Sequence, residues 1–182
     1  MAKKHDIIWL ESADSTNEEC KRHISDLDNL SVMAALSQTC GKGQRGNVWI
    51  SDPGKNLTFS ILLKSDNGSI FQVKACDQFI ISEAAALSVT DLLAAHGIPA
   101  KIKWPNDIYV GNRKICGILI EHSLRADRIS WSIIGIGLNV NQTIFPDDLP
   151  NPTSMALEGH PADIESILCE FLEIFRCASW LQ

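Results

Sequence analysis

Two short segments carry the residue types that bind anionic substrates. The first, G-K-G-Q-R-G-N-V-W at residues 41–49, places three glycines, a lysine and an arginine within nine residues. Glycine lets the backbone bend closely around a ligand, and the two cations attract negative charge. The second, K-W-P-N-D at 103–107, is followed by R-K-x-x-G at 113–117. This combination of lysines, an amide and a carboxylate predicts a site for a triphosphate with a divalent cation.

The polar side chains of the second segment are expected to bind two different groups, the phosphates and the metal ion. Lys103 and Lys114 are expected to offset phosphate charge, while Asn106 and Asp107 offer the oxygen ligands that Mg²⁺ prefers. Residues 100–110 and 113–121 each have the composition of a strand, with a Gly-Asn turn between them that is typical of a β-hairpin. We therefore expect the polar side chains to converge at one end of two neighbouring strands.

The glycine segment matches several nucleotide-binding patterns in part. Gly41, Gly43 and Gly46 fit the G-x-G-x-x-G of dinucleotide-binding folds, but that fingerprint requires a helix directly afterwards, and a turn and a strand are predicted here. A protein kinase would also need H-R-D and D-F-G segments, which the sequence lacks. The phosphate loop G-x-x-x-x-G-K-[ST] fails because Asn47 stands where lysine is required. A flexible surface turn is the remaining alternative.

Hydrophobic periodicity places these segments in an α+β fold. Strands are predicted at 6–11, 32–37, 56–63, 100–110, 113–121 and 131–140, and helices at 15–24, at 71–96 and after 163. Ser15 and Glu18 have capping-box spacing, Gly97 is a C-terminal stop for the long helix, and Asp163 is the N-cap of the last one. Clustered strands with helices between and beside them indicate a mixed, largely antiparallel sheet backed by helices.

Bulk properties narrow the class of protein. A chain of 182 residues suits one domain spanning 1–182, and a net charge of −6 does not favour a broad nucleic-acid-binding surface. Six cysteines without C-x-x-C or zinc-ligand spacing indicate reduced thiols. The N-terminus does not form a signal peptide, and no run approaches the roughly 18 apolar residues of a membrane helix. We expect a cytoplasmic protein with neither nucleic acid nor membrane as a partner.

Taken together, the motifs resemble those of biotin–protein ligases, also called biotin–[acetyl-CoA-carboxylase] ligases or holocarboxylase synthetases. Besides K-W-P-N-D, the markers are D-S-T-N at 14–17, Q-T-C-G-K-G-Q-R-G-N at 38–47, R-K-x-x-G-I-L-I-E at 113–121 and G-I-G-L-N at 135–139. The resemblance implies a catalytic domain with a class II aminoacyl-tRNA synthetase-like fold. It also implies that biotin is activated with ATP and Mg²⁺ as biotinoyl-5′-AMP. A lysine of a biotin carboxyl carrier domain would then accept the biotinoyl group.

The resemblance also implies roles for individual residues. The residues implied for biotin are Ser15, Thr16, Asn17, Gln38, Gly41, Lys42, Lys114 and Gly117. Those implied for ATP and the adenylate are Gly43, Gln44, Arg45, Gly46, Trp49, Asn106, Lys114 and Asn139. Lys42, Arg45, Lys103 and Lys114 would act in catalysis, and Asn106 and Asp107 would bind the metal. Trp49 would close the adenylate site and Asn139 would read the adenine edge.

The sequence departs from the family pattern at the glycine segment. Where much of the family has G-R-G-R-x-G, Lys42 and Gln44 replace the two arginines, and Arg45 follows one place later. Lysine keeps the charge but loses the bidentate geometry of a guanidinium. We therefore expect either compensation by Arg45 or weaker retention of the adenylate.

Two further expectations concern the domain content of the chain and the alternative functions. Some family members carry an N-terminal winged helix, and members usually continue into a small C-terminal β-barrel. We expect this chain to be the catalytic domain alone, without a repressor role. A sheet-edge homodimer is compatible with this fold. A lipoate–protein ligase shares the fold and the adenylate chemistry, but its R-R-x-S-G-G-type segment is missing here. A catalytically silent module that holds biotin or its adenylate is the other alternative.

Overall fold

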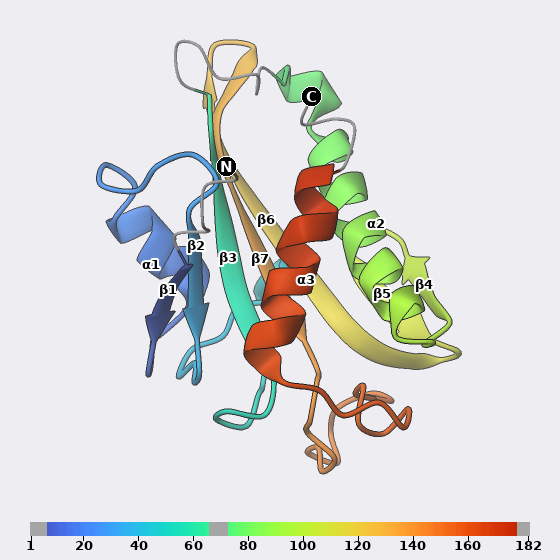
Figure 1. Ribbon diagram of the computed structural model, residues 1–182. Helices are drawn as coiled ribbons and strands as arrows, with labels where there is room; N and C mark the ends of the chain where they lie inside the picture. Colours follow the sequence, from blue (N-terminus) through green and yellow to red (C-terminus); the bar gives the residue numbers. More distant parts are fainter. Residues whose placement is uncertain (1–6, 66–72, 178–182) are drawn as a thin grey trace.

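The computed structural model describes residues 7–65 and 73–177, which form one seven-stranded sheet (Figure 1). The strand order is β1-β2-β3-β7-β6-β5-β4. The strands are β1 (Ile7–Leu10), β2 (Val32–Ala35), β3 (Leu57–Lys64), β4 (Ala100–Lys103), β5 (Asp107–Val110), β6 (Arg113–Arg125) and β7 (Arg128–Leu138). β1 and β2 pair in parallel, and every other neighbouring pair in this sheet is antiparallel. The predicted mixed, largely antiparallel sheet is confirmed.

The helices α1 (Thr16–Arg22), α2 (Phe79–Ala95) and α3 (Ile164–Cys177) pack on the sheet. Alternate residues of a strand point to opposite faces, and the central strand β7 follows this rule. Ile134 and Ile136 join the main core, which includes residues of α2 and α3, whereas Ile133 packs in a smaller cluster with Cys20 and Leu27. The sheet therefore has a face covered by α2 and α3 and an opposite face that carries α1.

The prediction of a single strand over 100–110 is wrong. β4 and β5 pair antiparallel, with Lys103 opposite Asp107 and a turn at 104–106. Pro105, in this turn, has no backbone N–H to donate to a strand ladder. β5 then pairs with β6 across the predicted Gly111 turn, where φ is 60°. The segment therefore adds two strands to the sheet instead of one.

The long central helix is shorter than predicted. α2 begins at Phe79 after a 3₁₀ turn at Ala75–Asp77, and residues 71–72 of the predicted span lie outside the described residues. It ends where predicted, because Gly97 follows with a φ of 75° that glycine adopts without strain. The last helix also begins as predicted: the backbone N–H of Ser166 donates to an Asp163 carboxylate oxygen at 2.9 Å.

The expectation about apolar runs needs one correction. The helical segment Ala75–Ala95 is long and apolar enough, by length and composition, to cross a membrane. However, α2 buries eight of its residues, and several of them belong to the main core between the sheet and α3. The core helix of a water-soluble domain meets the same length and composition criteria, so this segment is weak evidence for a membrane span.

The prediction about the cysteines is confirmed. All six thiols are free, two of them buried and four exposed. Burial raises the pKa of Cys20 to about 12, so this thiol stays protonated and packs as a small apolar group.

We expect Phe171→Ala to lower the free energy of unfolding by about 3–5 kcal/mol, the usual cost of deleting a buried aromatic ring. Phe171 is 1% exposed, and its ring centroid lies 5.2 Å from that of Phe59 and 5.7 Å from that of Phe175. Urea unfolding measures the change. Leu87→Ala, at a 47% exposed position of α2, is the control, with an expected change within about 0.5 kcal/mol. Similar losses for both variants would contradict the packing described here.

Candidate active site

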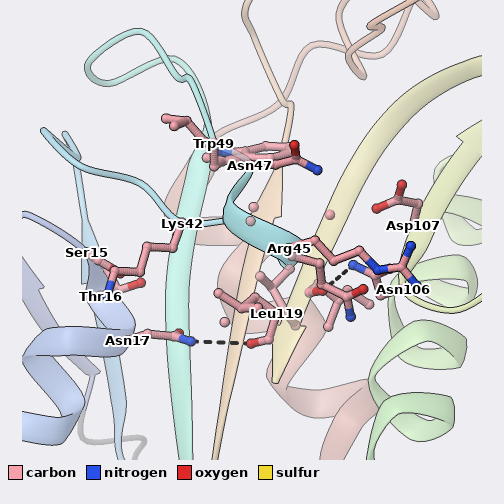
Figure 2. Close-up of a pocket in the computed structure, with 18 of the residues that line it drawn as sticks. Ser15, Thr16, Asn17, Lys42, Arg45, Asn47, Trp49, Asn106, Asp107 and Leu119 are labelled. Atoms are coloured by element: carbon pink, nitrogen blue, oxygen red, sulfur yellow. Dashed lines mark hydrogen bonds between the residues drawn. The ribbon is translucent and has the colours of Figure 1, made fainter. Parts of the chain in front are cut away.

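A cavity of about 240 Å³ lies on the α1 face of the sheet, beside the glycine segment (Figure 2). Most of the predicted site residues line it, namely Ser15, Thr16, Asn17, Gln38, Lys42, Gly43, Gln44, Arg45, Trp49, Asn106, Asp107, Lys114 and Gly117. The sequence prediction missed Asn47, Val48, Pro105, Ile118, Leu119, Gly135, Ile136 and Gly137, which also line it. Segments distant in the sequence therefore form one site.

The α1 end of the cavity is rich in hydrogen-bonding groups. Gln38 Oε1 accepts a bond from the Thr16 backbone N–H at 2.8 Å and one from Thr16 Oγ1 at 3.3 Å. The predicted capping box is wrong, because the Ser15 side chain makes no capping hydrogen bond. Instead, the backbone N–H of Thr16, at the N-terminus of the helix, donates to the side chain of Gln38, which is 22 residues further along the chain. Ser15 is 3% exposed and lines the cavity, so its hydroxyl is available to a polar ligand.

Asn17 connects α1 to the floor of the cavity. Its Oδ1 accepts a bond from Ser60 Oγ at 2.6 Å, and its Nδ2 donates to Glu121 Oε2 at 2.9 Å. Lys21 binds the other oxygen of Glu121 at 2.7 Å, so the carboxylate holds both α1 side chains. A Cβ at Gly135 would collide with the Asn17 side chain, lying 2.9 Å from its Cγ. This glycine lets the amide rest directly on β7.

Trp49 lies on a second pair of glycines in the cavity floor. Gly117 of β6 and Gly137 of β7 are opposite each other in the ladder. A Cβ at Gly137 would lie 2.7 Å from the indole Nε1, and one at Gly117 would lie 3.1 Å from Cζ3. The sequence offered a signal here, since glycines inside a strand often mark the close approach of another group. The indole Nε1 is buried without a hydrogen-bond partner among the described residues.

The glycine segment closes on itself as a small hairpin. Lys42 and Val48 form an antiparallel bridge, and the Trp49 N–H donates to the Gly41 carbonyl at 2.9 Å. A 3₁₀ turn at Gln44–Gly46 forms the tip, where Arg45 has a φ of 56°. No α-helix follows the glycines before β3 in this described stretch, which confirms that the segment is not a dinucleotide-binding turn.

The opposite end of the cavity is charged. Lys114 Nζ lies 2.7 Å from Asp107 Oδ1 and 5.9 Å from the centroid of the Trp49 ring. Asn106 Nδ2 donates to the Ile118 carbonyl at 2.8 Å. Figure 2 shows Arg45 extending toward Asn106 and Asp107. This end can therefore place two cations near one carboxylate and one amide.

Lys42 lies at the other side of the cavity, with Ser15 and Thr16 (Figure 2). Its Nζ is 2.6 Å from a carboxylate oxygen of Glu18, which also binds Lys21 at 2.9 Å. Hydrogen bonds from these two lysines hold the pKa of Glu18 below its usual value, so the carboxylate is ionised. The residue predicted to cap α1 thus holds the glycine segment against α1 instead.

A β-bulge directs Lys114 into the cavity. Strict alternation would place Lys114 and Gly117 on opposite faces of β6, because they are three residues apart. Between β5 and β6 the register shifts, so that Tyr109 is opposite Lys114 and Ile108 is opposite Cys116. The extra residue re-aims its neighbours, and Lys114 Nζ comes within 3.4 Å of a Cβ position at Gly117.

Four predicted residues do not line the cavity: Gly41, Gly46, Lys103 and Asn139. Lys103 lies on β4, where its Nζ is 3.4 Å from Tyr109 Oη and 4.5 Å from the ring centroid of that tyrosine. Asn139 is 4% exposed and donates to the Thr153 carbonyl at 2.9 Å. Its Oδ1 is buried without a partner among the described residues, and the contact with the adenine edge stays a prediction.

The two predicted metal ligands, Asn106 and Asp107, both line the cavity. Within residues 7–65 and 73–177, no cluster of three or more His, Cys, Asp or Glu side chains could hold a metal ion. Asp107 and Asn106 supply one carboxylate and one amide at the cavity. This set suits Mg²⁺, which commonly binds through one or two carboxylates plus substrate phosphates.

The comparisons with known proteins agree with the geometry. The model of the "Biotin/lipoate A/B protein ligase family" matches residues 9–139. The "Bifunctional ligase/repressor BirA" of Bacillus spizizenii is 39% identical over 149 residues, which cover 80% of this chain and 44% of that protein. "Biotin--protein ligase 1, chloroplastic" of Arabidopsis thaliana is 34% identical over 175 residues, covering 93% of this chain and 46% of that one. The chain thus spans about half the length of these curated relatives.

A solved structure supports the same assignment. The biotin protein ligase from Aquifex aeolicus in complex with biotin and ATP superposes with a TM-score of 0.76 at 29% identity, covering 97% of this chain and 70% of that one. The predicted fold, that of the class II synthetase-like biotin ligase catalytic domain, is confirmed. The chain belongs to the biotin/lipoate A/B protein ligase family, and its relatives include biotin–protein ligases.

Proposed function

We propose that this chain carries the catalytic domain of a biotin–protein ligase. It would use ATP to convert biotin to biotinoyl-5′-AMP and pyrophosphate, and then transfer the biotinoyl group to a lysine of a biotin carboxyl carrier domain. The single observation that carries the proposal is that one cavity is lined by uncharged hydrogen-bonding groups at one end and by cations at the other. Hydrogen-bonding groups at Ser15 and Gln38 suit the biotin ureido ring, and Lys114 and Arg45 at the other end suit a carboxylate and phosphates.

In the first step, the adenylation of biotin, the charged end of the cavity would bind the reacting anions. The biotin carboxylate attacks the α-phosphorus of ATP, and two anions must approach each other. Lys114 and Arg45 reduce this repulsion and stabilise the charge that develops on the phosphoryl oxygens. Asn106 and Asp107 would hold Mg²⁺, which neutralises phosphate charge when it is bound. Trp49 over the glycine floor would separate the reacting centre from water, which limits hydrolysis of the adenylate.

Biotin-dependent ATP–pyrophosphate exchange tests the proposal, with lipoate and octanoate as parallel substrates. Exchange with biotin alone is the expected result. Exchange with lipoate or octanoate instead would overturn the substrate assignment. Biotin binding without exchange would favour a silent binding module over an enzyme.

The remaining expectations belong to the same proposal. Residues 1–182 would act as a single catalytic domain, in the cytoplasm, with neither nucleic acid nor membrane as a partner. A homodimer could form by pairing of an outer strand of the sheet, since β1 and β4 are at its two edges. Analytical ultracentrifugation with and without biotin would detect such a dimer.

We expect Gln44→Arg to slow the release of biotinoyl-5′-AMP by about tenfold, because a guanidinium at the cavity wall would add a charge-assisted bond to the adenylate phosphate. The measurement is adenylate dissociation in the absence of acceptor. Ile50→Arg adds the same charge at an exposed position that does not line the cavity and should not alter release. Unchanged release from Gln44→Arg would mean that Arg45 already compensates.

A further inference from the structure

A second cavity, of about 230 Å³, adjoins the first. Four residues line both: Gln44 of the glycine segment, Pro105 and Asn106 of the turn between β4 and β5, and Ile118 of β6. The two spaces therefore meet along these residues, next to the charged end of the first cavity. None of the roles considered so far uses the second cavity.

Among the described residues, no strand pairs with the second half of β6 on the side where the second cavity lies. The pairing of β5 with β6 ends where Asp107 is opposite Gly117, with one more bond from the Ile118 N–H to the Asn106 carbonyl at 2.9 Å. Beyond this point Ile120 and His122, which line the second cavity, pair on the β7 side of the strand. The start of α2 forms the opposite wall. A side chain can thus approach the charged end of the first cavity around the edge of the sheet.

The charges of the two cavities differ. Lys42, Arg45 and Lys114 line the first, whereas the described residues that line the second include no lysine or arginine. Burial lowers the pKa of His122, whose Nδ1 is 2.8 Å from Ser132 Oγ, so the ring is neutral near pH 7. Anionic substrates are attracted to the first cavity. An ammonium group is repelled there but meets no fixed positive charge in the second.

The lining and rim also suit an amine on an aliphatic stem. Phe79, Ile118 and Ile120 offer apolar surface, against which the methylene groups of a lysine side chain can pack. Phe79, which lines the second cavity, is 48% exposed, and Trp104, the chain neighbour of the lining residue Pro105, is 74% exposed. Exposed aromatic side chains of this size are enriched among the residues that dominate protein–protein binding.

We propose that the acceptor lysine of the carrier domain reaches the acyl-adenylate through this second cavity, while the carrier domain docks against Phe79 and Trp104. The inference rests on the proposed ligase function, because that function requires a protein amine as acceptor. At the junction the uncharged lysine Nζ forms a bond to the acyl carbon, the bond from that carbon to the phosphate oxygen breaks, and AMP leaves with the electron pair. The two protons lost by the ammonium pass to solvent.

A pair of substitutions with opposite charge tests the route. Ser82, on the first turn of α2, lines the second cavity but not the first. Ser82→Arg is expected to slow single-turnover transfer from biotinoyl-5′-AMP to an isolated biotin carboxyl carrier domain by about tenfold, because it repels the incoming ammonium. Ser82→Glu has similar bulk and should transfer at about the wild-type rate. Both variants should keep biotin-dependent pyrophosphate exchange, and Leu87→Arg, an exposed position on the same helix, should resemble wild type.

The possible outcomes separate this inference from the proposed function. Transfer by Ser82→Arg at the wild-type rate, or equal losses in the Arg and Glu variants, would overturn the route. Absence of exchange in the wild-type protein would overturn the ligase function itself. Trp104→Ala provides an independent check: it should raise the KM for the carrier domain while leaving the KM for biotin and ATP unchanged. An equal rise in all three would contradict a docking role.

Discussion

Replacing Lys114 with glutamine is expected to slow biotin-dependent ATP–pyrophosphate exchange by about 10²- to 10³-fold, the usual effect of removing one donor that stabilises a transition state. The Lys114 ammonium lies at the charged end of the cavity, 2.7 Å from Asp107 and above the Trp49 ring. Glutamine keeps a comparable length and can still donate a hydrogen bond, but it cannot cancel the repulsion between a carboxylate and the α-phosphate. The loss should therefore fall on kcat more than on the KM for biotin.

Lys103→Gln is the matched control for this prediction. The two lysines are equally prominent in the sequence, but the structure places Lys103 over Tyr109 on β4, outside the cavity lining. We expect its exchange rate to stay within about threefold of wild type, since an exposed charge at this distance from the cavity is screened by solvent. Comparable losses in both variants would show that Lys103 moves into the site when ATP binds. Thermal unfolding of both variants excludes a loss caused by instability.

Gly137→Ala is expected to reduce adenylation by about 10²-fold, because a small displacement of groups that position a substrate has effects of this size. The added Cβ would overlap the Trp49 indole, which cannot yield without leaving the glycine floor. A displaced ring would open the space where we place the adenylate. Loss of tryptophan quenching on ATP binding, together with a raised KM for ATP, would report the displacement.

Gly135→Ala, two residues earlier on the same strand and facing the same side, provides the comparison. Its Cβ would meet Asn17 instead of Trp49, at the α1 end of the cavity. We expect the KM for biotin to rise in this variant while the KM for ATP changes little. If both glycine variants changed the same kinetic constant, the assignment of biotin and adenylate to opposite ends of the cavity would be wrong.

Local sequence patterns predicted the elements and most of the site. Gly111 and Gly97 have backbone conformations that other residues adopt with strain, so these glycines were sufficient to place the hairpin and the end of α2 from the sequence. The Asp163 cap forms through its own neighbour Ser166, three residues away. Residue type and spacing named Lys114 for the phosphates, whereas Ser15 and Gln38 were implied for biotin by the resemblance to biotin–protein ligases; all three line the cavity.

Interactions between distant segments decided what the sequence could not. The sequence pairs Glu18 with Ser15 in a capping box, but in the structure Glu18 binds Lys42, 24 residues away. This ion pair can form only when the glycine segment lies against α1, so the local sequence could not predict it. Strict alternation along β6 would turn Lys114 away from Gly117, and the bulge against β5 brings both to the cavity. The second cavity joins Ser82 to Ile120, and nothing in either local sequence indicates the other.

The sequence by itself therefore determined the Gly111 turn, the C-terminal end of α2 and the start of α3, because these depend on backbone preferences and hydrogen bonds within a few residues. Tertiary structure alone decided that Lys103 stays outside the cavity, that Trp49 rests on Gly117 and Gly137, and that a second cavity opens beside the first. These features depend on strand register and on contact between surfaces that are far apart in the chain, and such contacts are set by burial and packing of the whole sheet.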